Sequence, residues 1–300
     1  MKILFTFPGQ GGQRPGMLAM IPDREAILTQ ARAVLGDEVD TLDSADSLQH
    51  TRAVQLCLLI AGVAWARELQ RQGVDPQMVS GLSIGAFPAA VIAGALDFAS
   101  ALRLVALRGD LMEQSYPEGY GLTAIMGLTR PRVEALMQGH EVYLANLNAE
   151  TQFVIAGRDE AMAEVAQLAL RAGASKAQQL AVSVPSHCAL LDNPAAELAK
   201  AFAGASLRRP WCAYLSGSTA RVLWDPQRIA DDLAMNMARP VHWQEAMVAA
   251  DERDARLAIE MPPGGVLTCL TRQAGWRGET IALERSGLDV ARHLAQRLSD

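Results

Sequence analysis

The chain has 300 residues, of which 50% are hydrophobic, and a formal net charge of −6. A chain of this size can bury a sizeable core, so we expect one large globular domain with a smaller insertion or partner domain. Its basic residues are scattered, which argues against nucleic acid or an anionic membrane as a partner. The longest apolar run, residues 56–66, is too short to cross a bilayer.

The cysteines and the N-terminus indicate the compartment. Four cysteines lie far apart without C-x-x-C spacing, which fits reduced thiols and argues against a zinc site. The first apolar run, residues 3–7, is interrupted by Pro8 and Gly9 and does not resemble a signal peptide. We therefore expect a cytoplasmic protein without a metal.

The first third of the chain alternates short strands with helices. A glycine-rich loop, residues 8–13, follows the first strand and fits either half of an oxyanion hole or an ordinary turn. The pattern predicts strands over 3–7 and 76–82 and helices over 24–35, 51–72 and, from about residue 89, after the second strand.

A serine lies on the sharp turn that follows the second predicted strand. The sequence Gly81-x-Ser83-x-Gly85 between a strand and a helix is typical of a nucleophile elbow. A helix N-terminus also offers free N–H groups to a developing oxyanion. Taken alone, the same pentapeptide also fits a turn that merely links a strand to a helix.

The order of predicted strands and helices changes in the middle of the chain. Asp97 is expected to cap a helix that ends at Pro117. The order strand, helix, strand, strand, helix, strand that follows is that of a ferredoxin-like unit. Its predicted elements are 122–128, 130–137, 141–146, 152–156, 159–172 and 178–184. We therefore assign residues 122–183 to a small subdomain inserted into an α/β core made of residues 1–121 and 184–300.

The core resumes after the small subdomain. We expect a helix that ends near Phe202, strands over 213–215 and 257–260, and a closing helix over 288–298.

A serine nucleophile needs a base, and histidine titrates closest to neutral pH. His187 follows Pro185 at the point where the subdomain returns the chain to the core, which makes it the best candidate. A structural histidine is the alternative at that position. The other four are expected at the surface (His50, His140, His293) or packed against an indole (His242).

Five ordered motifs carry a family resemblance. They are Phe7-Pro8-Gly9-Gln10-Gly11, Gly81-Leu82-Ser83-Ile84-Gly85, Leu107-Arg108-Gly109, Val184-Pro185-Ser186-His187-Cys188 and Glu260-Met261-Pro262-Pro263-Gly264-Gly265. Together they resemble the malonyl-CoA:acyl-carrier-protein transacylase family over nearly the whole chain. The resemblance implies a large α/β-hydrolase-like acyltransferase domain with an inserted ferredoxin-like subdomain, and no permanently bound cofactor.

The resemblance also implies the roles of individual residues. Ser83 would attack the thioester of malonyl-CoA, and His187 would serve as general base and then general acid. The N–H groups of Gln10 and Ile84 would form the oxyanion hole. Arg108 would bind the malonyl carboxylate, which suits a planar, permanently charged guanidinium. Asn236 would orient His187 through its side-chain carbonyl.

Two positions depart from the family pattern. Leu82 stands where the family usually has histidine, and Ala86 where it usually has glutamate or glutamine. On this basis the chain looks most like the malonate decarboxylase epsilon-type subunit, which loads a carrier subunit that bears a CoA-like thiol arm. The alternatives are a transacylase of fatty-acid or polyketide synthesis and, less favoured, a serine hydrolase or thioesterase. Arg130, Arg132 and Arg171 are candidates for steering an acidic carrier.

Overall fold

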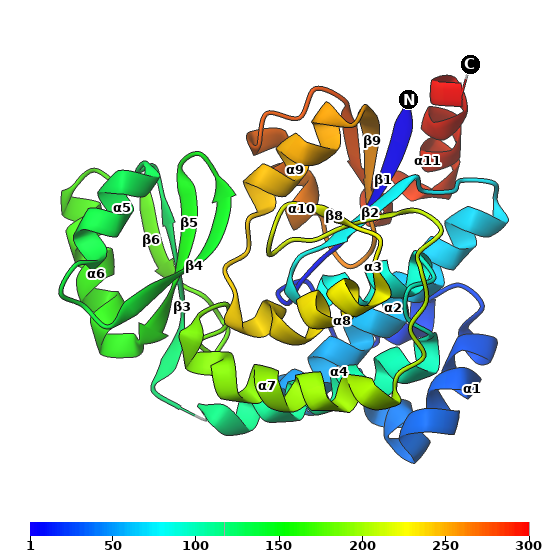
Figure 1. The fold of residues 1–300 in the computed structure, drawn as a ribbon, viewed down its shortest axis with the longest axis horizontal. Helices are drawn as coiled ribbons and strands as arrows, with labels where there is room; N and C mark the ends of the chain where they lie inside the picture. Colours follow the sequence, from blue (N-terminus) through cyan, green and yellow to red (C-terminus); the bar gives the residue numbers. More distant parts are fainter. Residues whose placement is uncertain (117, 300) are drawn as a thin grey trace.

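The computed structural model describes residues 1–116 and 118–299, which form two β-sheets with helices around them (Figure 1). The predicted helix breaker Pro117 and the last residue of the predicted core, Asp300, lie outside the described residues. The larger sheet has six strands in the order β10-β9-β1-β2-β7-β8. These strands are β1 (Lys2–Phe7), β2 (Met78–Gly81), β7 (Ala213–Leu215), β8 (Val222–Leu223), β9 (Ala255–Glu260) and β10 (Glu279–Ala282).

The larger sheet is parallel except at one edge, where β8 runs antiparallel to β7. Both of its faces are covered, as a parallel sheet requires. Along β1, Ile3 and Phe5 pack into one hydrophobic cluster while Leu4 packs into another. Successive side chains of a strand point to opposite faces, so the short apolar run at the N-terminus fills both cores.

Two sets of helices cover the two faces. Helices that pack into the larger cluster are α1 (Arg24–Leu35), α2 (Thr51–Arg71), α3 (Ala86–Ile92), α4 (Phe98–Ser115), α7 (Asp192–Ala201), α8 (Pro226–Met235) and α11 (Leu283–Ser299). The other face is covered by α9 (Trp243–Glu252) and α10 (Val266–Gln273). Asp97 caps α4 as predicted, since its side chain accepts a hydrogen bond from the Ser100 N–H. Within the described residues, no helix is both long and apolar enough to cross a membrane.

The smaller sheet stands apart at the left of Figure 1, with its two helices on one face. Its four strands are antiparallel neighbours in the order β4-β5-β3-β6, which is the ferredoxin-like arrangement that the order of elements predicts. The elements are β3 (Tyr120–Met126), α5 (Arg130–Met137), β4 (Val142–Ala149), β5 (Gln152–Arg158), α6 (Asp159–Arg171) and β6 (Lys176–Gln179). The division of the chain at residues 122 and 183 stays a proposal.

Two predicted elements differ from the structure more than the others do. The last strand of the small sheet ends at Gln179 rather than at residue 184, and only the Leu180 N–H continues its pairing, by donating to Leu122 O at 2.8 Å. The closing helix begins at Leu283 and contains one non-helical residue, Gly287, with φ of 77°. Glycine adopts a positive φ readily, so the helix is interrupted at Gly287 and then continues.

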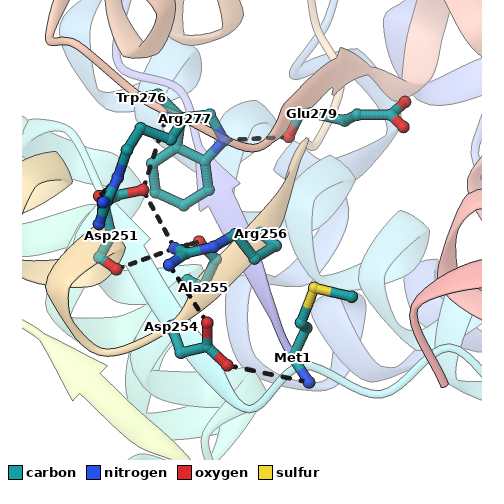
Figure 2. A network of polar contacts seen from close by, with 8 residues as sticks. All are labelled: Met1, Asp251, Asp254, Ala255, Arg256, Trp276, Arg277 and Glu279. Atoms are coloured by element: carbon teal, nitrogen blue, oxygen red, sulfur yellow. Dashed lines mark hydrogen bonds and ion pairs between the residues drawn. The ribbon is translucent and has the colours of Figure 1, made fainter.

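A polar network lies at the amino ends of β9 and β10 (Figure 2). Asp251, near the end of α9, accepts from Arg256 Nη1 at 3.1 Å and from Arg277 Nε at 2.6 Å. Arg256 also pairs with Asp254 at 3.2 Å. The network therefore joins a helix to two neighbouring strands at the end of the sheet opposite the predicted nucleophile.

Candidate active site

The glycine-rich loop and the serine turn lie side by side because they end adjacent strands. β1 and β2 are parallel neighbours, with Phe7 paired to Gly81, and the Leu82 N–H donates to Phe7 O at 3.0 Å. Ser83 follows with a positive φ of 58°, at the start of a 3₁₀ turn that leads into α3. A left-handed serine between strand and helix is the strained geometry of a nucleophile elbow.

Glycine is required where the loop and the elbow touch. A Cβ at Gly85 would lie 2.1 Å from Phe7 O, and one at Gly81 would lie 2.0 Å from the Gly85 carbonyl carbon. A Cβ at Gly9 would lie 3.8 Å from Ser83 Cβ. The bare backbone thus brings the residues after Gly9 and after Ser83, namely Gln10 and Ile84, close to the serine.

His187 contacts the serine directly. Its Nε2 lies 2.9 Å from Ser83 Oγ, and the residue is 3% exposed. Its Nδ1 lies 2.8 Å from the main-chain oxygen of Asn236 and 3.2 Å from that of Arg239. A carbonyl oxygen can only accept, so Nδ1 must carry the proton and donate, which leaves Nε2 as the acceptor for the Ser83 hydroxyl.

The surroundings of His187 keep the ring neutral. Burial, together with the charge of Arg108, lowers its pKa to about 4, although the hydrogen bonds to the Asn236 and Arg239 carbonyls oppose this shift. Burial disfavours the charged imidazolium, and a nearby cation does the same. At neutral pH the ring is therefore free to accept a proton, as a general base must.

Arg108, on α4, is fully buried beside the serine. Its Nη1 donates to Gln55 Oε1 at 2.7 Å, and its Nη2 donates to Asn236 Oδ1 at 3.0 Å and to Ser83 Oγ at 3.2 Å. The guanidinium also lies 5.9 Å from the centroid of the Phe87 ring. Burial lowers the pKa of Arg108 to about 9, so the side chain still carries its charge at neutral pH.

Among the residues that the structure describes, Arg108 has only neutral acceptors. Within residues 1–116 and 118–299 no carboxylate pairs with it, and its Nε is buried without a hydrogen-bond partner. A buried cation without an anion is costly, and a buried N–H without an acceptor adds to that cost. The arrangement is suited to receive a carboxylate next to the serine.

Asn236 contacts three members of the site. Its side-chain Nδ2 donates to Ser83 O at 3.2 Å, while Oδ1 accepts from Arg108 and the main-chain carbonyl accepts from His187. The prediction that the side-chain carbonyl of Asn236 orients His187 is therefore wrong. The main-chain carbonyl of the same residue makes that contact. The guanidinium attracts the side-chain oxygen through a charge-assisted hydrogen bond.

Gln55, on α2, belongs to the site although the sequence analysis missed it. It is fully buried, its Oε1 accepts from Arg108, and its Nε2 lies 3.4 Å from Gln10 Oε1. The available signal was an amide side chain within a long apolar helix, since such a group needs buried partners.

The remaining predicted positions lie around this centre. Leu82 is half-buried and packs with the smaller core cluster, and Ala86 is buried. Arg130, Arg132 and Arg171 are exposed on α5 and α6, where Arg130 pairs with Glu134. Among the described residues, no group of histidine, cysteine and acidic side chains could hold a metal ion.

Comparisons with known proteins identify the family of this chain. Residues 4–286 match the family model of the acyl transferase domain. The chain is 36% identical over 285 residues to the malonyl CoA-acyl carrier protein transacylase of Escherichia coli (strain K12), covering 91% of this chain and 92% of the relative. It is 31% identical over 298 residues to that of Bacillus subtilis (strain 168), covering 94% and 93%.

Solved structures give the same result. An acyl-carrier-protein S-malonyltransferase from Burkholderia pseudomallei 1710b superposes with a TM-score of 0.91 at 33% identity, covering 98% of this chain and all of the other. A malonyl-transacylase in complex with the acyl-carrier protein of a type II polyketide synthase superposes with a TM-score of 0.91 at 34% identity, covering 98% and 99%. The α/β acyltransferase fold is thereby confirmed. The chain belongs to the malonyl-CoA:acyl-carrier-protein transacylase family, and it is an acyltransferase.

Proposed function

We propose that this acyltransferase moves the malonyl group from malonyl-CoA to the thiol of an acyl carrier protein of fatty-acid or polyketide synthesis. The observation that carries the proposal is Arg108, a fully buried cation that donates to Ser83 Oγ and has no carboxylate partner among the described residues. Malonyl differs from acetyl by one carboxylate, and the guanidinium is placed to recognise it. The names of the relatives from Escherichia coli and Bacillus subtilis, and the carrier complex of a similar transacylase, support the same assignment.

The proposed reaction has two half-reactions. Ser83 Oγ attacks the thioester carbonyl while His187 Nε2 takes the hydroxyl proton; the carbon–sulfur bond then breaks, and CoA leaves as a thiol with that proton. The carrier thiol next attacks the carbonyl carbon of the malonyl ester and gives its proton to His187. The bond between that carbon and Ser83 Oγ then breaks, the malonyl thioester of the carrier leaves, and His187 returns the proton to the Ser83 oxygen. The N–H groups of Gln10 and Ile84 are the proposed donors to the oxyanion. Serine and histidine supply this chemistry, so no resident cofactor is needed.

A second candidate acceptor is the carrier subunit of malonate decarboxylase, which the sequence analysis favoured. It depends on Leu82 and Ala86, which depart from the usual elbow, and the curated relatives support the first candidate better. Comparing kcat/KM for the two purified carriers at matched concentration decides between them. A clear preference for the decarboxylase carrier would reverse the order of the candidates, and the cytoplasmic location stays a prediction under either.

The covalent intermediate tests the proposed reaction. Brief exposure to malonyl-CoA without a carrier should add one malonyl group to the peptide that contains Ser83, as measured by mass spectrometry. The Ser83→Ala variant should stay unlabelled. Labelling at Cys188, which lies next to His187, or no labelling in the wild-type enzyme, would contradict the mechanism.

A further inference from the structure

The carbonyl groups that hold His187 all come from one short segment. Asn236 O and Arg239 O contact its Nδ1, and Met237 O accepts from its main-chain N–H at 2.6 Å. This segment, residues 236–239, comes directly after α8. The position of His187 therefore depends on what fixes the end of α8.

Asp232 joins the last turn of α8 to the larger sheet. Its Oδ2 accepts from the Tyr214 hydroxyl at 2.8 Å, and its Oδ1 accepts from Ser216 Oγ at 2.6 Å. Tyr214 belongs to β7 and is 1% exposed, and Ser216 follows that strand and is fully buried. The main-chain oxygen of Asp232 also accepts from the Asn236 N–H, so the same residue closes the helical turn that leads to the histidine contacts.

The anchoring group extends into the loop after β7. Ser216 Oγ accepts from the N–H groups of Ser218 and Thr219 at 3.2 and 3.0 Å, while its own proton goes to Asp232. Partly buried networks of this kind are rigid when every member has a partner, and they become costly when one member is lost. The same helix also buries the apolar residues Ile229, Ala230, Leu233 and Ala234 in the larger cluster.

We propose that Asp232 is a positioning residue: through Tyr214 and Ser216 it fixes the end of α8, so that residues 236–239 hold His187 against Ser83. This inference rests on the proposed function, because it assigns Asp232 a part in the same reaction. Asp232 does not touch the reacting atoms, so its removal should slow the chemical step without weakening substrate binding.

The neighbouring residue on α8 is a matched control. Asp231 has the same side chain but is exposed, and the one hydrogen bond that it accepts from the described residues comes from Gln227 Nε2 on its own helix, at 3.3 Å. Asp231→Ala therefore removes a carboxylate from α8 without cutting the connection to β7. The conservative variant Asp232→Asn keeps a side-chain oxygen that can accept from Ser216 Oγ, and its amide can donate to the Tyr214 hydroxyl oxygen.

The test measures the single-turnover rate of Ser83 malonylation, the KM for malonyl-CoA and the melting temperature. Asp232→Ala should label Ser83 about tenfold to a hundredfold more slowly, since a displacement of about 1 Å can cost a hundredfold in rate. Its KM should stay within about twofold of wild type. Asp231→Ala should match wild type, and Asp232→Asn should recover most of the rate. If Asp232→Ala does not fold, the double variant Tyr214→Phe, Ser216→Ala replaces it with the same expectation.

Two results would overturn the inference. One is a folded Asp232→Ala that labels Ser83 as fast as Asp231→Ala; the other is an Asp232→Asn as slow as Asp232→Ala, which would show that the charge is needed rather than the anchoring. Both leave the proposed function in place if the wild-type enzyme is labelled at Ser83. Failure of the wild-type enzyme to form the ester would instead contradict the proposed function.

Discussion

The arginines at the two ends of the larger sheet differ in the partners that they have within the protein. At the amino end, Arg256 and Arg277 share the carboxylate of Asp251 (Figure 2), whose side chain is 11% exposed. At the carboxyl end, the Arg108 guanidinium is fully buried, and the part of the chain that the structure describes offers it only neutral oxygens. The charges of the first group are paired within the protein, whereas we propose that the counter-charge of the second comes from the substrate.

The pKa values follow the same contrast. Burial alone would raise the pKa of Asp251, but the hydrogen bonds and charges of Arg277 and Arg256 lower it. Burial lowers the pKa of Arg108 to about 9 with no opposing carboxylate. A buried charge without a partner in the protein is typical of a binding site, so we propose that Arg108 recognises a ligand, whereas Asp251 has a structural role.

Replacing Arg108 should have the largest effect. In Arg108→Ala the malonyl carboxylate would be buried without a partner, at a cost of roughly 3–5 kcal/mol. At about 1.4 kcal/mol per tenfold, kcat/KM for malonyl-CoA should fall by a hundredfold or more. Acetyl-CoA, which has no carboxylate, should gain relative to malonyl-CoA. Equal losses for the two donors would show that Arg108 supports the fold instead.

The pH dependence of kcat/KM should show the low pKa of His187. Protonation at Nε2 removes the acceptor for the Ser83 proton, so activity is lost as pH falls through the His187 pKa of about 4. We expect a level profile from neutral pH down to about 5, half of the full value near pH 4, and a loss of about tenfold per pH unit below that. A fall already centred near 6.5, the ordinary value for histidine, would contradict the contribution of burial and of Arg108.

The acid limb of kcat should differ from that of kcat/KM. A bound malonyl carboxylate would neutralise Arg108 and remove its lowering effect on the pKa of His187. Because kcat reports the substrate complex and kcat/KM the free enzyme, the acid limb of kcat should lie at higher pH. The displacement should be smaller with acetyl-CoA. An equal displacement of the acid limb with malonyl-CoA and with acetyl-CoA would show that the charge of Arg108 does not lower the pKa of His187.

Removing Asp251 should affect stability and leave catalysis unchanged. Asp251→Ala should lower the free energy of unfolding at pH 7 by about 1–2 kcal/mol, toward the lower figure because Arg277 is exposed. The Asp251 pKa is lowered in the folded state, so its stabilisation is present above the unfolded value near 3.9 and is lost as pH falls through the folded value. Urea unfolding at two pH values measures this. If kcat of Asp251→Ala were more than about twofold below that of wild type, Asp251 would affect catalysis as well as stability, and the two ends of the sheet would not differ as argued.

The sequence allowed the fold and the contact between Ser83 and His187 to be predicted because their signals are local. The turn at Gly81-x-Ser83-x-Gly85 needs small residues next to the serine, and the structure places a backbone oxygen within 2.1 Å of the Cβ that Gly85 lacks. The βαββαβ order likewise fixed the small sheet, since short connections leave few topologies. His187 was found from its place after Pro185, and it lies 2.9 Å from Ser83 Oγ.

The parts that escaped prediction depend on contacts between distant segments. Gln55 is 53 residues from Arg108, and no local pattern says which buried amide will meet which cation. Asp232 looks like Asp231 in the sequence, and only the packing of α8 on β7 distinguishes them. Asn236 was predicted correctly as a neighbour of His187 but through the wrong carbonyl, because its side chain turns to Arg108.

The central claim is that the counter-charge of Arg108 comes from the substrate, and a crystal structure of the enzyme carrying malonyl on Ser83 tests it most directly. The account predicts that the malonyl carboxylate accepts hydrogen bonds from the Arg108 guanidinium, with one of them from Nε, the donor that has no acceptor within the described part of the chain. A malonyl group whose carboxylate points to solvent, or pairs with another cation while Arg108 keeps its contacts to Gln55 and Asn236, would contradict it.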